Sequence, residues 1–335
     1  MRVADLGEFG LIARLQERLD ARGVTGAPIV GIGDDAAVWA ADRFEIATTD
    51  TLVQGVHFPE RPRSWRRLGW KALAVNVSDV AAMGGTPAYA LVTLALPGDL
   101  PADDVFDLYE GLADCAKAYG VAVAGGDVVA APVVVVTVAL NGWARVGPDG
   151  DAALLRRDAG RPGDVVAVTG HLGAAAAGVR LLLGATALQD AAEPLLRAQE
   201  RPEPRLDAGR AALDAGVRCA IDVSDGLVQD LGHICERSRC GAVLWAEKVP
   251  VAVELVAAFP DDALELALSG GEDYELLFTG TPAQVEAVRR AVDVPVTVVG
   301  ELVEGPPRVR IEGPGGRELH VGAGGWNHFA GRRAP

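Results

Sequence analysis

Residues 31–36 read Gly31-Ile32-Gly33-Asp34-Asp35-Ala36, which formally matches the G-x-G-x-x-[GA] fingerprint of dinucleotide-binding folds. The surrounding sequence argues against that fold. A strand pattern at 44–48 follows about eight residues later, too soon for the crossover connection of a parallel strand pair, which takes about a dozen residues or more. Two adjacent aspartates would also face the pyrophosphate directly. The stretch instead predicts an acidic turn between short strands at 28–32 and 36–40.

Four further clusters resemble this turn, because each places aspartate beside glycine, serine or threonine next to an apolar run. The clusters are Thr48-Thr49-Asp50, Asn76-Val77-Ser78-Asp79, Gly125-Gly126-Asp127 and Asp222-Val223-Ser224-Asp225-Gly226. Each one alone has an ordinary explanation as a turn or a helix cap. Five together favour carboxylates that converge in the fold, where their repulsion calls for cations. Mg²⁺ prefers oxygen ligands, so the pattern predicts a metal-dependent enzyme of phosphate chemistry.

The composition indicates a globular protein of about two domains, since the chain has 335 residues and a domain usually has roughly 150. The net charge of −15 argues against a nucleic-acid partner, because such binding depends on Lys and Arg. The chain has only three lysines, Lys71, Lys117 and Lys248, and no Walker-type phosphate loop. Bound phosphates would therefore be held by metals, backbone amides and arginines.

Helical and strand patterns alternate along the chain. Helices are expected at 6–19, 65–83 and 105–119, and strands at 88–96, 121–124 and 133–140. A stretch rich in Gly, Pro, Asp and Arg follows, and the mixed pattern then resumes. We therefore expect an α/β (α+β) fold of two domains, each a mixed sheet with helices packed on it. The expected boundaries are 1–143 for the first domain, 144–163 for a linker and 164–335 for the second domain.

Three of the acidic clusters have a functional interpretation beside the ordinary one. Asp79 lies inside a helical pattern, where a carboxylate is either exposed or buried with a partner, and its apolar neighbours favour burial. Gly125-Gly126 would let a ligand approach the backbone closely. Ser224-Asp225-Gly226 opens a helix, where it is either a simple cap or a phosphate site of free amides beside metal-binding acids.

Seven motifs, in order along the chain, resemble those of the thiamine-monophosphate kinase family. They lie at 31–36, 49–58, 71–84, 125–127, 221–227, 269–276 and 325–329. That family belongs to the superfamily of aminoimidazole ribonucleotide synthetase and selenophosphate synthetase. The resemblance implies a homodimer of two-domain α/β subunits, with a first domain that binds ATP and several Mg²⁺ ions and forms the dimer. It also implies direct phosphoryl transfer from ATP to thiamine monophosphate, which gives thiamine diphosphate.

The resemblance further implies roles for individual residues. The metal ligands would be Asp35, Thr48, Thr49, Asp50, Asp79, Asp127, Asp222 and Asp225. Of these, the central catalytic residues would be Asp50, Asp79, Asp127 and Asp225. ATP would be contacted by Gly126, Asp127, Arg157 and Ser224, with Arg156 as the alternative to Arg157. The thiamine substrate would be contacted by His57, Glu272 and Trp326, each of which also has an ordinary structural explanation.

Other features concern location and rival functions. The longest apolar run, at 121–138, is interrupted by Gly125-Gly126-Asp127 and Pro132, so no membrane partner is expected. The four cysteines lack zinc or disulfide spacing, which favours reduced thiols and a cytoplasmic location. The rivals are another ATP-using member of the superfamily, similar to aminoimidazole ribonucleotide synthetase or selenophosphate synthetase, and a non-catalytic nucleotide- or metal-binding module. Cys115 is the first cysteine and lies in a helical pattern, which argues against a selenophosphate synthetase.

Overall fold

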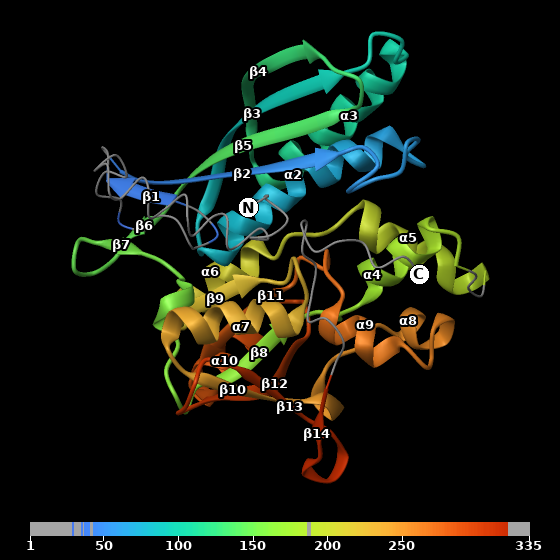
Figure 1. Ribbon diagram of the computed structural model, residues 1–335. Helices are drawn as coiled ribbons and strands as arrows, with labels where there is room; N and C mark the ends of the chain where they lie inside the picture. Colours follow the sequence, from blue (N-terminus) through green and yellow to red (C-terminus); the bar gives the residue numbers. More distant parts are fainter. Residues whose placement is uncertain (1–28, 30–34, 36, 41–42, 186–188, 321–335) are drawn as a thin grey trace, which may run out of the picture.

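The computed structural model describes residues 29, 35, 37–40, 43–185 and 189–320 of the chain. These residues form two lobes, each built on its own sheet, and the two sheets lie on either side of the predicted linker (Figure 1). The expected two-part α/β architecture is confirmed. The helix expected at 6–19 and the substrate contact expected at Trp326 lie outside the described residues. Among the described helices, none has the length and hydropathy that a bilayer span requires.

The first lobe contains a five-stranded mixed sheet in the order β1-β2-β5-β3-β4. Its strands are β1 (Ala37–Ala40), β2 (Phe44–Val53), β3 (Thr86–Leu96), β4 (Ala122–Ala130) and β5 (Val135–Trp143). Two helices, α2 (Trp65–Ala82) and α3 (Ala102–Tyr119), cover one face and bury the apolar side chains that alternate along the strands. Residues on the opposite face of β3 and β5 stay partly or fully exposed, so the described part of the chain leaves this face open.

Helices α2 and α3 pack with their backbones in close contact. A Cβ added at Gly69 of α2 would lie 1.8 Å from the carbonyl oxygen of Leu108. One added at Gly111 of α3 would lie 1.6 Å from the carbonyl oxygen of Arg66. Glycine is needed at both positions, because any side chain would force the two helices apart.

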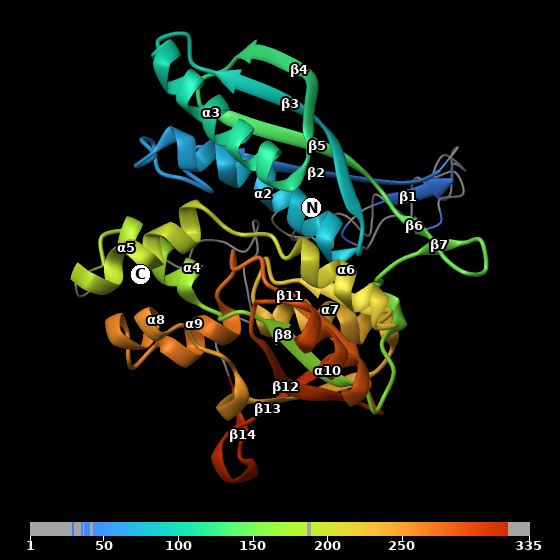
Figure 2. The same cartoon turned by 180° about the vertical axis from the view of Figure 1, so that it is seen from behind.

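Helix α2 also carries much of the contact between the lobes, as the view from behind shows (Figure 2). It packs on α6 (Leu206–Asp214), where a Cβ at Gly209 would lie 2.1 Å from the carbonyl oxygen of Ala81. The indole N–H of Trp70 donates a 2.7 Å hydrogen bond to the carbonyl oxygen of Pro202. Most of the 18 residues of α2 are buried, so this helix is a shared core element of both lobes.

The second lobe contains a seven-stranded sheet in the order β14-β13-β10-β12-β8-β11-β9. Its strands are β8 (Val165–Thr169), β9 (Cys219–Asp222), β10 (Gly241–Trp245), β11 (Leu276–Gly280), β12 (Val296–Val303), β13 (Val309–Glu312) and β14 (Glu318–Leu319). Besides α6, its helices are α4 (Ala174–Leu182), α5 (Gln189–Glu200), α7 (Leu227–Ser238), α8 (Val253–Ala258), α9 (Ala263–Ser269) and α10 (Pro282–Ala291). Helices α4, α5, α8 and α9 share a separate small core beside the sheet.

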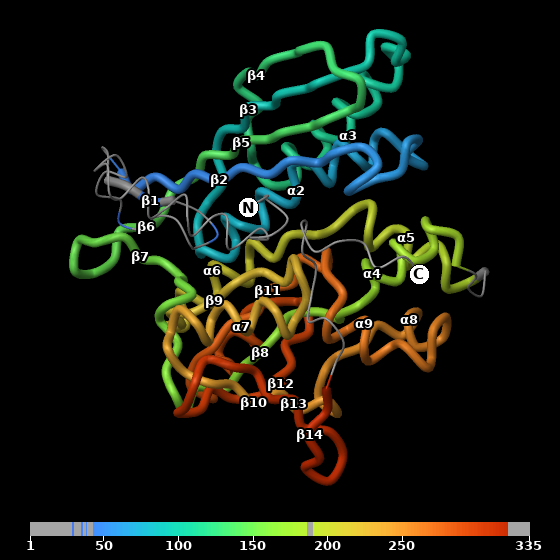
Figure 3. Tube along the Cα trace, in the orientation of Figure 1, coloured from blue at the N-terminus to red at the C-terminus, as the bar shows by residue number. Residues whose placement is uncertain are grey.

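The chain passes from the first lobe to the second through the predicted linker segment (Figure 3). This segment contains a short hairpin of β6 (Arg145–Val146) and β7 (Ala152–Ala153) and a 3-10 helix, η1 (Arg157–Ala159). The segment is therefore ordered, and η1 places its side chains against the junction of the lobes.

The main difference from the expected elements concerns Gly125-Gly126-Asp127. The sequence predicts a strand that ends at residue 124, but β4 continues through this cluster to Ala130. Gly126 is required there because its Cβ would lie 1.8 Å from the carbonyl oxygen of Val92 on β3. The register of the β3–β4 pair also shifts just before the cluster. Asp127 thus lies in an edge strand and not at the tip of a loop.

Candidate active site

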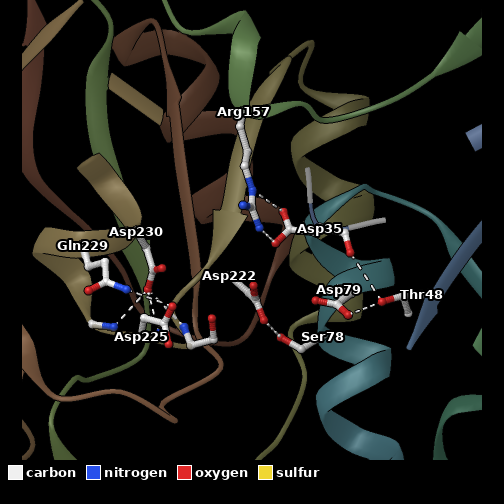
Figure 4. A network of polar contacts seen from close by, with 11 residues as sticks. Asp35, Thr48, Ser78, Asp79, Arg157, Asp222, Asp225, Gln229 and Asp230 are labelled. Carbon is white, nitrogen blue, oxygen red and sulfur yellow. Dashed lines mark hydrogen bonds and ion pairs between the residues drawn. The ribbon is translucent and has the colours of Figure 1, made fainter. Parts of the chain in front are cut away.

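Acidic side chains from four segments meet where the two lobes join, and Figure 4 shows three of them, Asp35, Asp79 and Asp222. Asp35 precedes β1, Asp50 lies on β2, Asp79 lies on α2 and Asp222 ends β9. Asp35, Asp79 and Asp222 each offer one carboxylate oxygen within 4.8 Å of the other two. Residues that are far apart in the sequence therefore form one acidic cluster, with contributions from both lobes.

Hydroxyl groups orient two of these carboxylates. Thr48 Oγ1 donates a 2.5 Å hydrogen bond to Oδ2 of Asp79, and Ser78 Oγ donates a 2.7 Å hydrogen bond to Oδ2 of Asp222. Thr48 and Asp50 share the face of β2 that is covered by α2, because side chains alternate along a strand. Ser78 and Asp79 are neighbours on α2, so this helix contacts a strand of the first lobe and a strand of the second with consecutive residues.

Burial and mutual repulsion raise the pKa values of Asp50, Asp79 and Asp222. Burial raises the pKa of Asp50 to about 6, and the charge of Asp35 adds to the increase, whereas a hydrogen bond with Asp79 opposes it. Burial, followed by the charge of Asp50, raises the pKa of Asp79 well above its usual value. Burial and the charge of Asp35 do the same for Asp222. Acids that bind protons this tightly in the folded state also favour a bound cation.

A guanidinium group already lies among these carboxylates. Arg157 of η1 forms a two-point ion pair with Asp35, through Nε at 3.1 Å and through a terminal nitrogen. Arg156 forms a two-point pair with Asp158 at 2.8 and 2.6 Å. Of the two arginines considered for the ATP contact, Arg157 is the one that the structure places at the acidic cluster.

The side chains of Thr49 and Asp127 do not reach the acidic cluster of their own chain. The Thr49 hydroxyl points to the other face of the sheet from Thr48 and donates to the carbonyl oxygen of Val138 at 3.0 Å. Asp127 pairs with Thr93 on the open face, whereas Asp50 lies on the covered face. A metal contact of Thr49 would have to use its backbone, and one of Asp127 would have to involve another chain.

The loop Ser224-Asp225-Gly226 is organised by an aspartate that sequence reasoning missed. Asp230 of α7 is 1% exposed, and its Oδ2 accepts the backbone N–H groups of Ser224, Asp225 and Gly226 at 3.1, 3.1 and 3.0 Å. The expectation that free amides at this loop bind phosphate is therefore wrong, because their donors are already used. The Asp225 carboxylate is oriented by Gln229, whose Nε2 donates at 3.0 Å (Figure 4).

His57, one residue of the expected thiamine contact set, lines a pocket between the lobes, and Glu272, a second, contacts residues of that lining. His57, Phe58, Leu68, Lys71, Leu182 and Gln199 contribute to its lining. Nδ1 of His57 accepts the N–H of Val53 at 2.9 Å, which places the proton of a neutral ring on Nε2. Glu272 contacts two of the lining residues, since Lys71 donates to its Oε1 at 2.6 Å and Gln199 donates to its Oε2 at 3.2 Å. Sequence reasoning missed Lys71, although a lysine inside an apolar helical run was a usable signal.

The four cysteines are buried and do not provide alternative chemistry. Burial raises the pKa of Cys115 and of Cys240, and it raises the pKa of Cys235 to about 12. The thiolate is the reactive form of cysteine, so these shifts suppress nucleophilic chemistry. Inert thiols agree with the expected cytoplasmic location, which stays a prediction.

Both lobes match models of a single protein family. Residues 33–144 match the AIR synthase related protein, N-terminal domain, and residues 161–312 match the AIR synthase related protein, C-terminal domain. The fold, with its acidic site at the junction of the lobes, is therefore that of the AIR synthase related proteins.

Similar proteins define the family within this class. The thiamine-monophosphate kinase of Bacillus subtilis (strain 168) is 37% identical over 309 residues, which cover 90% of this chain and 93% of the relative. That of Escherichia coli (strain K12) is 37% identical over 336 residues, which cover 97% and 98%. The structure of AaThiL complexed with AMPPCP and TMP is 33% identical, with a TM-score of 0.84 over 98% of this chain and 99% of that chain. The chain belongs to the thiamine-monophosphate kinase family.

Proposed function

We propose that this chain is an ATP-dependent kinase that phosphorylates thiamine monophosphate to thiamine diphosphate. The proposal depends on one observation above all: the aspartate cluster lies at the junction of the lobes in a chain 37% identical to thiamine-monophosphate kinases. The solved relative with a TM-score of 0.84 contains AMPPCP, an analogue of ATP, together with TMP. These relatives confirm the function that the motifs imply.

The acceptor substrate brings its own nucleophile, an oxygen of its phosphate group. A phosphate monoester loses its second proton near about pH 6, so it is mostly a dianion at neutral pH. A bond forms between this oxygen and the γ-phosphorus of ATP, and the bond from that phosphorus to the ADP oxygen breaks. No side chain has to remove a proton. The barrier comes from the repulsion of two anions, so catalysis depends on positioning and on charge neutralisation.

The acidic cluster fits divalent cations of the Mg²⁺ type. Its donors are carboxylate oxygens of Asp35, Asp79 and Asp222, with Asp50 beside them, and such hard oxygen ligands suit Mg²⁺. Repulsion between these carboxylates adds to burial in raising the pKa values of Asp50, Asp79 and Asp222, and the Arg157 guanidinium shows that a cation is accommodated among them. Asp35, Asp50, Asp79 and Asp222 would hold such cations, whose positive charge would offset the repulsion between the phosphates of the two substrates.

The remaining residues divide between the two substrates. Arg157 and the loop with Ser224 lie on the side of the acidic cluster formed by the second lobe, where we place the phosphates of ATP. His57 lines the pocket between the lobes, and Glu272 accepts hydrogen bonds from two other lining residues, so we place the thiamine group there. The carboxylate of Glu272 would favour the cationic thiazolium ring through its charge.

We also propose that the enzyme is a homodimer joined through the open face of the first sheet. Tyr89, Leu91 and Val129 lie on this face and are 51%, 49% and 45% exposed. An apolar face that ends in an exposed edge strand is typical of an association surface. Gly126 and Asp127 lie on the same edge strand. A partner bound there would allow their expected contacts with ATP and metal to form across the interface.

The function is tested by measuring ADP release from ATP with and without thiamine monophosphate, in Mg²⁺ and in EDTA. We expect ADP to form only when thiamine monophosphate and the divalent cation are both present, with an equal amount of thiamine diphosphate. ADP release that does not depend on thiamine monophosphate would favour another superfamily activity. Tight binding of ATP without turnover would favour a non-catalytic module.

A further inference from the structure

A lysine of the first lobe reaches the glutamate that is expected to contact thiamine. Lys71 lies on α2, and its side chain is only 2% exposed. Its Nζ donates a 2.6 Å hydrogen bond to Oε1 of Glu272, in the loop between α9 and β11. A buried ammonium group is strongly disfavoured without a charged partner. The placement of Lys71 therefore depends on Glu272, and the orientation of the carboxylate depends on Lys71.

Glu272 is held from other directions as well. Gln199 of α5 donates to Oε2 at 3.2 Å, and the backbone N–H of Glu272 donates to the carbonyl oxygen of Ser224 at 2.8 Å. The φ angle of Glu272 is 70°, in the left-handed region that a residue other than glycine keeps only when its surroundings enforce it. At the preceding Gly271, a Cβ would lie 2.4 Å from the same Ser224 oxygen. Backbone and side chain of Glu272 are thus both fixed before substrate binds.

The two donors to Glu272 also line the pocket between the lobes near which we place the thiamine group. Lys71 and Gln199 line this pocket together with His57. Lys71 comes from the first lobe and Gln199 from the second, so the orientation of Glu272 depends on both lobes. Glu272 meets the pocket through these two lining residues, so its orientation is coupled to theirs.

We infer that Lys71 is a positioning residue for thiamine monophosphate, which acts by holding the Glu272 carboxylate in its orientation at the pocket. This inference rests on the proposed function. A lysine that merely joined the lobes would affect both substrates alike when removed. A lysine that acts through Glu272 affects the substrate that Glu272 contacts, and its effect disappears once the Glu272 charge is gone.

The test is a double-mutant cycle of Lys71→Met and Glu272→Gln, with KM measured separately for thiamine monophosphate and for ATP. We expect Lys71→Met to raise the KM for thiamine monophosphate by about tenfold, which is within the range measured for coupled neighbours. The KM for ATP should change by less than about twofold, and in the Glu272→Gln background Lys71→Met should add less than about twofold to either value. Lys117→Met, an exposed lysine on α3, is the matched control.

A second variant covers the case in which Lys71→Met fails to fold. Gln199→Ala removes the other donor to Glu272 without leaving a buried charge, and it should raise the KM for thiamine monophosphate alone. Equal increases for both substrates, or single effects that multiply in the double mutants, would overturn the inference. A wild-type protein without thiamine monophosphate-dependent ADP release would instead refute the proposed function, so the two failures can be told apart.

Discussion

Asp50 shows what an acidic site does to the stability of the metal-free protein. Burial raises its pKa to about 6, whereas an aspartate in an unfolded chain titrates near about 3.9. The folded state therefore binds this proton more tightly than the unfolded chain does. The stability that results is fully present below about pH 4 and is lost as the pH rises through about 6. Asp79 and Asp222 shift in the same direction and add to the loss.

We predict that the metal-free protein melts at a lower temperature at pH 7.5 than at pH 5, and that Asp50→Asn reduces this difference. One pKa unit corresponds to about 1.4 kcal/mol, so the effect of the cluster should amount to several degrees. Calorimetry in EDTA measures it. Asp261→Asn, which changes an exposed carboxylate just before α9, should follow the wild type. The prediction is wrong if Asp50→Asn keeps the wild-type pH dependence.

The same substitution should separate stability from activity. At pH 7.5 without metal, Asp50→Asn should be at least as stable as wild type, because it relieves repulsion among the carboxylates. Its kinase activity should fall by orders of magnitude, and it should lose most of the increase in melting temperature that ATP and Mg²⁺ give the wild type. A variant with normal turnover and full stabilisation by ATP and Mg²⁺ would show that Asp50 is only a structural residue of β2.

Asp230 should affect the affinity for ATP and Mg²⁺, although we place it outside direct contact with the substrates. Asp230→Asn keeps one oxygen that can accept N–H groups but replaces the other with an amide NH₂ group, which cannot accept a hydrogen bond from the Ser224-Asp225-Gly226 loop. We expect ATP and Mg²⁺ to bind about tenfold more weakly, as is typical when a group that orients a metal ligand is changed. Titration calorimetry with AMPPCP and Mg²⁺ measures this. Glu236→Gln, on an exposed part of the same helix, should bind normally; an equal loss in both variants would contradict the assigned role.

The sequence predicted the acidic cluster better than it predicted the groups that support it. Aspartates at the ends of apolar runs pointed to convergence, and Asp35, Asp50, Asp79 and Asp222 do converge. Asp230 follows the loop it organises by only four residues, but a charged residue in the first turn of a helix is ordinary, so nothing local singles it out. Lys71 depends on Glu272, which lies two hundred and one positions away. Such a pairing is set by the approach of the two lobes and leaves no local pattern.

The α2–α3 pair offers a test of helix packing. Gly111→Ala places a methyl group against the carbonyl oxygen of Arg66, so we expect a loss of about 3 kcal/mol or more in the free energy of unfolding. Gly232→Ala is the matched control, because a Cβ at this position of α7 meets no atom within 4 Å. That variant should gain up to about 1 kcal/mol from helix propensity. Urea denaturation compares the two, and a Gly111→Ala protein as stable as wild type would contradict the close packing.

Elements with regular patterns were predicted well, and those with irregular residues were not. The helix expected at 65–83 corresponds to α2, and the strand expected at 88–96 lies within β3. Helix α5 was not expected, and it contains Pro194, which normally argues against a helix interior. Strand β4 was expected to stop before Gly125, because paired glycines are typical of turns. Its continuation depends on pairing with β3, which the local sequence does not reveal.

The open face of the first sheet leads to a prediction for the assembled protein. Leu91→Arg places a charge among the exposed apolar residues of this face, so we expect the dimer to dissociate into folded monomers. Analytical ultracentrifugation measures the change in mass, and circular dichroism checks the fold. Val253→Arg, which alters a residue of α8 that is 73% exposed, should remain dimeric. A wild-type protein that sediments as a monomer would refute the proposed homodimer.

The two-lobe organisation was predictable, but the way the lobes meet was not. The glycine- and proline-rich stretch after Trp143 separates the two sheets, as its composition suggested. The meeting of the lobes depends on contacts such as Gly209 against Ala81, in which a single missing side chain permits close approach. The sequence shows a glycine there, but it does not show which backbone comes near it.

Helix α2 also fixes the distance between the two halves of the site. Lys71 at the proposed thiamine pocket and Asp79 at the acidic cluster lie on this one helix, about two turns or 12 Å apart along its axis. A single helix therefore sets the spacing between two groups. Lys71 is expected to orient the group that contacts the cationic end of the substrate, and Asp79 is expected to hold metal near its phosphate. We therefore expect the enzyme to select its substrate by length as well as by charge, since a molecule that is too short or too long cannot contact both ends.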